Sequence, residues 1–182
     1  MKHRLNLIAA PPSYQPGEYI GQAYADATRP LTPHADFTIE KSLVGWRVSL
    51  VWRCATPATS AAGDTNRFVD SAALLAPAHP DAPMISMGGG DLPVEGLLWR
   101  ADWKAPMKIR AEGFGTVQRL AAPQGWTAVG VWQHGLWSVR FEFPSWPALE
   151  QQKSIGVAIW QGASAQRAGL KSVTGDWLKV KV

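Results

Sequence analysis

The sequence predicts an all-β fold, a β-sandwich of two antiparallel sheets in immunoglobulin-like layers with long loops at one end. Several short runs alternate apolar and polar residues with the two-residue period of a half-buried strand. No window keeps the 3.6-residue period of a helix over several turns. Segments rich in Pro, Gly, Ser and Asp separate the runs, as loops and turns do.

The clearest strand is GWRVSLVWR at residues 45–53, because its two Trp, its Leu and one Val share one face. WSVRFEF at 137–143 repeats the pattern, and the pair His134-Gly135 predicts a tight hairpin with TAVGVWQ at 127–133. SWPALEQQ after Ser145 predicts one short helical turn. Further strands are expected at 67–76, 97–103, 108–120, 154–161 and 176–182.

Length and composition predict one globular domain over residues 1–182, with 1–36 as a less certain N-terminal extension. Apolar residues make up 46% of the chain and charged residues 18%, as in a folded protein. The net charge of +4 is mild and the basic residues are scattered, so we expect no nucleic-acid partner. The single cysteine, Cys54, excludes an internal disulfide and lies in a strand-like run, where we expect it to be buried.

Two features bear on the membrane and on export. No apolar run approaches the roughly 20 residues of a membrane-spanning helix. The apolar start of the chain breaks at Pro11 and Pro12, too soon for a signal peptide.

The ten tryptophans indicate either a Trp-rich core or a surface that binds a ligand or a partner. One function to consider is therefore a cofactor-free binding module that stacks loop tryptophans, such as Trp126 and Trp146, on a carbohydrate. Another is a structural subunit that holds a partner through its Trp surface.

Catalytic motifs are missing from the sequence. It holds no Ser-His-Asp context, no nucleotide-type glycine motif and no pair of His at metal-ligand spacing. The four His are isolated, and His134 lies in a predicted turn. Asp91 and Glu95 flank a glycine run without a base or metal partner nearby in sequence. Nothing in these patterns indicates a hydrolase.

The loop DAPMISMGGGDLP, residues 81–93, places Met84 and Met87 beside three consecutive glycines. Glycine runs allow a sharp bend or a close approach of the backbone. Thioether sulfur is a soft, neutral ligand that suits soft metals and haem iron. The common alternative is that both methionines fill gaps in the core.

Three segments together resemble a known family. RFVDSAALLAP, MISMGGGDLPVEGLLWRADW and SIGVAIWQGASAQRAGLKSVTGDWLKV are similar to the haem b-binding γ subunits of ethylbenzene-dehydrogenase-type molybdenum enzymes (the type II DMSO reductase family). That group includes the γ subunits of chlorate and selenate reductases, dimethylsulfide dehydrogenase and steroid C25 dehydrogenases. The resemblance extends from about Trp46 to Val182.

The resemblance implies a β-sandwich whose long loops form a pocket for one haem b, held between a loop Met and a Lys near the C-terminus. In this chain the Met that directly precedes glycine is Met87, and the Lys of RAGLKSV is Lys171. Met84 remains an alternative to Met87. Lys171 must be neutral as a ligand, because an ammonium has no lone pair to donate.

Other residues are candidates for the haem pocket. Trp99 and Trp103 are candidate walls, and Arg100 and Arg167 are candidate partners of the haem propionates because Arg matches carboxylates well. Ordinary surface exposure of both Arg remains the alternative.

The resemblance also implies partners. It places the chain in a periplasmic heterotrimer with a molybdenum-cofactor α subunit and an iron–sulfur β subunit. The haem subunit would then relay electrons to or from an external carrier such as a c-type cytochrome. The substrate and the direction of electron flow belong to other chains, and this sequence does not specify them.

Overall fold

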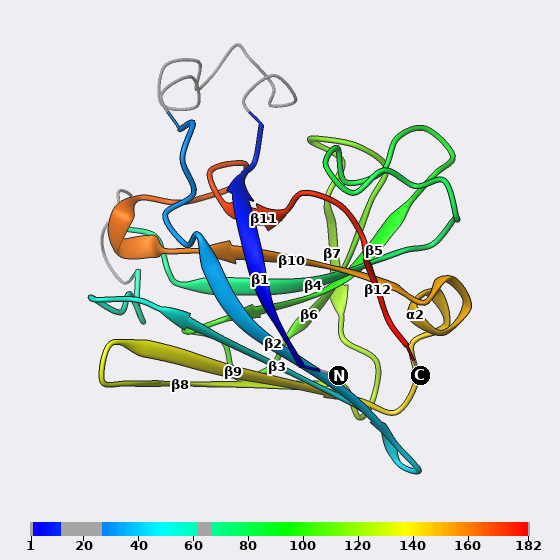
Figure 1. Ribbon diagram of the computed structural model, residues 1–182, viewed down its shortest axis with the longest axis horizontal. Coiled ribbons are helices and arrows are strands. Elements are labelled where there is room, and N and C mark those ends of the chain that lie inside the picture. Colours follow the sequence, from blue (N-terminus) through cyan, green and yellow to red (C-terminus); the bar gives the residue numbers. More distant parts are fainter. Residues whose placement is uncertain (1, 12–26, 62–66, 182) are drawn as a thin grey trace.

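The computed structural model describes residues 2–11, 27–61 and 67–181 (Figure 1). Within these ranges the chain forms twelve strands, and neighbouring strands pair antiparallel. The strands are β1 (Lys2–Ala9), β2 (His34–Ser42), β3 (Gly45–Arg53), β4 (Ser71–Pro77), β5 (Val94–Arg100), β6 (Met107–Ala111), β7 (Gln118–Ala121), β8 (Thr127–Gln133), β9 (Leu136–Phe143), β10 (Ser154–Trp160), β11 (Ser172–Thr174) and β12 (Leu178–Lys179). A short helix, α2 (Pro147–Gln152), and a 3₁₀ turn, η2 (Gly162–Ser164), complete the described elements.

The predicted all-β, antiparallel fold is confirmed, but the two layers are parts of one curled sheet. The strand order is β7-β6-β5-β4-β10-β11-β1-β2-β3-β9-β8, with β12 added beside β10. Strand β1 joins the layers because Lys2–Asn6 pair with β2 whereas Leu7–Ala9 pair with β11 (Figure 1). The first residues of the predicted N-terminal extension are thus an inner strand of the sheet. Residues 12–26 of that extension lie outside the described part of the chain.

The main core lies between the two layers. On β3 the alternate residues Trp46, Val48, Leu50 and Trp52 are buried, as the sequence period predicts. They pack against the inner faces of β4, β5, β9 and β10 in one hydrophobic cluster. The predicted hairpin at His134-Gly135 is present and pairs all of β8 with β9.

Strands β4 and β10 are buried on both faces. Their runs SAALLAP and SIGVAIW are almost wholly apolar, as in strands covered on both sides. One face of each belongs to the main core, and the other belongs to a second cluster that includes Met84 and Met87. The long loop between β4 and β5 therefore covers the outer face of this layer.

Several strand bounds differ from the prediction. The expected strand at 108–120 is two strands, β6 and β7, separated by a turn in which Gly113 and Gly115 have positive φ. The expected strand at 176–182 reduces to β12, and the chain before it contributes β11, which was not predicted. The helical turn after Ser145 is confirmed as α2.

Candidate functional site

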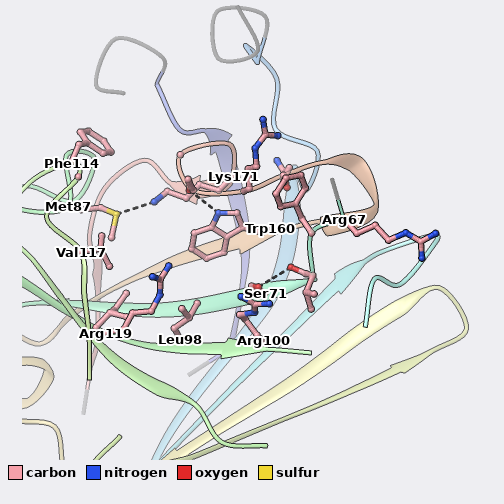
Figure 2. Close-up of a pocket in the computed structure, with 18 residues that line it drawn as sticks. Arg67, Ser71, Met87, Leu98, Arg100, Phe114, Val117, Arg119, Trp160 and Lys171 are labelled. Atoms are coloured by element: carbon pink, nitrogen blue, oxygen red, sulfur yellow. Dashed lines mark hydrogen bonds between the residues drawn. The ribbon is translucent and has the colours of Figure 1, made fainter. Parts of the chain in front are cut away.

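A cavity of about 520 Å³ opens on the outer face of the β4–β5–β10 layer. Strand residues such as Ser71, Leu98 and Trp160 form its floor (Figure 2). The glycine loop after β4, the β6–β7 turn and the segment before β11 form its sides. Its volume lies in the range of pockets that bind small molecules and cofactors.

Met87 and Lys171 meet inside this cavity. Lys171 Nζ donates to Met87 Sδ over 3.0 Å, although the two residues are far apart in the sequence (Figure 2). The relative exposure of Met87 is 7% and that of Lys171 is 6%. Lys171 forms no salt bridge to any carboxylate in the described part of the chain. Burial therefore lowers the pKa of Lys171 to about 8.

The glycine loop places the Met87 side chain in the cavity. Met87 itself has a left-handed backbone, with φ of 57°, which is uncommon for a residue other than Gly. A Cβ at Gly88 would lie 2.6 Å from the Leu92 carbonyl oxygen and 2.9 Å from that of Ala111. Gly88 is thus needed for a close approach between backbones, which fixes the turn that presents Met87.

Two contacts hold Lys171 in place. Its carbonyl oxygen accepts a hydrogen bond from the Ala10 N–H at the end of β1, over 3.0 Å. Its Nζ lies 5.2 Å from the centre of the Trp160 ring, a cation–π distance. The predicted loop that points this side chain inward is therefore tied to β1 and β10.

Within the described residues the cavity is lined by four arginines and by no Asp or Glu. Arg100 and Arg167 were predicted, whereas Arg67 and Arg119 were not singled out by sequence reasoning. Arg100 is held by Asp102 through two hydrogen bonds of 3.0 and 2.8 Å. Together with Lys171, these side chains make the cavity favourable for an anionic ligand. Arg67 heads the segment RFVDSAALLAP, whereas the exposed strand β7 gives no sequence signal for Arg119.

Met84 lies elsewhere. It is buried against β10, where a Cβ on Gly156 would lie 2.4 Å from the Met84 sulfur. It borders a second hollow, which Trp177 also lines, and it is not among the residues that line the main cavity. The structure therefore brings Met87, and not Met84, to Lys171.

The predicted Trp walls do not reach the cavity. Trp99 points to the main core, where its ring centre lies 5.0 Å from that of Trp137. Neighbouring residues of a strand face opposite sides, so Arg100 lines the cavity while Trp99 supports β5 from behind. Trp103 lies outside the cavity lining, and its ring packs under the Arg100 guanidinium at 4.8 Å.

The tryptophans suggested as a carbohydrate platform are buried. Trp126 and Trp146 pack on each other and on Phe143 with ring centres 5.3 to 5.5 Å apart. Their ring faces are therefore covered by protein and are not available to stack on a carbohydrate.

Cys54 is buried, as predicted, in a structural network. Its sulfur lies 3.5 Å from a carboxylate oxygen of Asp70, and burial together with this carboxylate raises its pKa to about 12. Asp70 also accepts hydrogen bonds from Trp137 Nε1 at 2.8 Å and from the Gly162 N–H at 2.7 Å. The Asp of the FVDSA segment thus joins elements of both layers and lies outside the cavity lining.

The described residues hold no group of three or more His, Cys, Asp or Glu arranged to bind a metal ion. They also include no helix that is long and apolar enough to span a membrane.

Three known proteins are similar to this chain. The chlorate reductase subunit gamma of Ideonella dechloratans is 28% identical over 74% of this chain and 59% of its own length. The "Putative respiratory nitrate reductase heme subunit ORF7" of Haloferax mediterranei is 30% identical over 71% of this chain and 49% of its own length. The dimethylsulfide dehydrogenase subunit gamma of Rhodovulum sulfidophilum is 26% identical over 96% of this chain and 68% of its own length.

These similarities confirm the predicted resemblance to the γ subunits of chlorate reductase and dimethylsulfide dehydrogenase, and the third relative is named as a heme subunit. The chain spans about half to two thirds of the lengths of these relatives. No protein-family model matches it.

Proposed function

We propose that this chain is a haem b-binding subunit that transfers electrons within an oxidoreductase complex, in which Met87 and Lys171 would hold the haem iron. One observation carries the proposal: the two side chains point toward each other, and are hydrogen-bonded over 3.0 Å, inside a cavity lined by arginines. A lysine is rarely buried without a carboxylate, because the charged amine loses its hydration. A bond to a metal ion would satisfy both the amine and the thioether.

Each ligand side chain has a defined task in this proposal. Lys171 must release its proton before it can donate a lone pair. With a pKa of about 8, this release costs only about 1–1.5 kcal/mol at pH 7. Met87 needs no proton release, because a thioether is neutral. When bound between two protein ligands, the haem would supply one-electron transfer, with no open iron position for substrate chemistry.

The arginines would hold the carboxylates of the haem. Arg167 donates to the Ala165 carbonyl oxygen over 3.1 Å and lies over the Phe68 ring, so its guanidinium is fixed at the cavity. Arg100 is likewise fixed by Asp102. We extend this role to Arg119, which lines the same cavity.

The names of the relatives support the assembly that we propose. Two of them are gamma subunits of a chlorate reductase and a dimethylsulfide dehydrogenase, and one is described as a heme subunit. We propose that this chain joins a molybdenum-cofactor α subunit and an iron–sulfur β subunit in the periplasm. It would exchange electrons between the β subunit and an external carrier, such as a c-type cytochrome.

The visible absorption spectrum tests this function. The protein should be purified with its partner subunits and with haem available, then measured as isolated, after dithionite, and after carbon monoxide. We expect a sharp Soret band with b-type bands on reduction, and no shift with carbon monoxide, because Met87 and Lys171 would leave the iron no open position. A colourless protein would refute the haem proposal. A spectrum that shifts with carbon monoxide would refute the ligand pair.

A further inference from the structure

Trp160 has two separate contacts with the segment that carries Lys171. It is the last residue of β10, and its backbone is paired with Ser71 of β4, so its position is set by the centre of the sheet. Its ring lies under Lys171 Nζ at 5.2 Å (Figure 2). Its indole Nε1–H donates to the Ala168 carbonyl oxygen over 2.9 Å.

The segment before Lys171 needs such support. Ala165 and Ala168 have positive φ values of 59° and 47°, which side chains other than Gly adopt at an energetic cost. Within the stretch itself, the Leu170 N–H donates to the Arg167 carbonyl oxygen over 2.8 Å. The indole of Trp160 therefore ties the middle of a strained segment to a rigid strand.

We infer that Trp160 is the positioning residue of the proposed haem site. Its N–H fixes the main chain at Ala168, and its ring face supports the Lys171 side chain so that Nζ points at Met87. This inference rests on the proposed function, because it assigns Trp160 a role in ligation by Lys171. It also explains why a tryptophan ends β10 at a place where the strand leaves the core and borders a cavity.

Two variants of Trp160 and one matched control test the inference in the full, haem-loaded protein. Trp160→Phe keeps an aromatic face but removes the N–H, and Trp160→Leu removes both. Trp132→Phe is the control, because Trp132 is also half-buried and donates to a backbone carbonyl oxygen, that of Cys54, over 2.9 Å on the other layer.

The first readout is an acid titration of the ferric Soret band. Protons compete with the iron for the lysine amine but not for the thioether, so the titration is sensitive to the Lys171 bond rather than to the Met87 bond. Loss of one hydrogen bond shifts a local equilibrium roughly fivefold, which corresponds to about 0.7 pH unit. We expect Trp160→Phe, which keeps the ring face over Lys171, to lose lysine ligation at a pH higher by about this amount, and Trp132→Phe at the wild-type pH.

The second readout is carbon monoxide binding to the reduced protein. Reduced wild type and reduced Trp132→Phe should not bind carbon monoxide. A fraction of reduced Trp160→Leu should bind it and show a shifted Soret band. Wild-type behaviour of both Trp160 variants in both readouts would overturn the inference and leave the proposed function intact. Equal shifts in the Trp160 variants and in Trp132→Phe would also overturn it, because they would report general loosening. A wild-type protein that binds no haem would overturn both the proposed function and the inference about Trp160.

Discussion

Replacement of Lys171 by Met should stabilise the haem-free protein at neutral pH. Burial lowers the pKa of Lys171 from its ordinary value of 10.5 to about 8. Below pH 8 the native state therefore holds a buried ammonium, and each unit of this difference costs about 1.4 kcal/mol of unfolding free energy, or about 3 kcal/mol in total. The Trp160 ring face offsets part of this cost. Because Met is apolar and of similar length, we expect a net gain of about 1–3 kcal/mol.

The pH dependence gives the sign of this effect. Between pH 8 and 10.5 the unfolded chain still binds the Lys171 proton while the native state has released it, so wild-type stability rises with pH in this window. The advantage of Lys171→Met should therefore be full below pH 8 and should disappear toward pH 10.5. Lysines that have the same pKa in the native and unfolded states do not affect the difference in unfolding free energy between wild type and Lys171→Met.

Urea unfolding of haem-free wild type and Lys171→Met, followed by Trp fluorescence at about pH 7 and about pH 10, measures the difference. Lys104→Met serves as the control, because Lys104 is exposed and its replacement should change little at either pH. A Lys171→Met advantage of the same size at both pH values would refute the buried ammonium. So would a variant that is less stable than wild type at about pH 7.

Three further predictions concern other residues. Met87→Ala should cause loss of haem or reactivity with carbon monoxide, whereas Met84→Ala should keep the wild-type spectrum; the reverse result would assign the ligand to Met84. Asp70→Asn should lower the urea-derived free energy of unfolding by about 2–4 kcal/mol, because an amide N–H₂ would face a buried donor, while the exposed Asp36→Asn should be nearly neutral. Cys54, with its raised pKa, should react with a thiol reagent at about pH 8 only after the protein unfolds, and rapid labelling of the native protein would contradict its burial.

The alternating strands were predictable, whereas the joining strand was not. Residues 45–53 and 137–143 carry a strict two-residue period, and both are strands with one buried face. The start of the chain, KHRLNLIA, has only a short apolar run and was not predicted as a strand, yet it forms β1. Its pairing with β2 and β11 depends on partners far away in sequence, which local periodicity does not reveal. A strand as short as β11 gives no periodic signal at all.

The site was predictable in part. Composition offered only soft ligands in a glycine loop, and the pairing of Met87 with Lys171 came from the family resemblance. Strand geometry could have corrected one prediction, because Trp99 and Arg100 are neighbours on β5 and cannot both face the same cavity. The position of Arg119 could not be predicted from the sequence, because its place beside the cavity depends on how β7 pairs with β6.

Several unfavourable features of the described residues lie where the cofactor is proposed to bind. Lys171 is buried with no carboxylate partner among the described residues, and Met87 and Ala168 have left-handed backbones, which residues other than Gly adopt at an energetic cost. Strands β4 and β10 lie beneath these residues and are buried on both faces. Their packing in the main core stabilises the fold and offsets the free-energy cost of these features. A ligand that bonds to both Met87 and Lys171 would recover part of the lost free energy only in the folded state. Binding and folding stability should therefore be linked, with the sheet fixed and the loops as the part that gains most from the ligand.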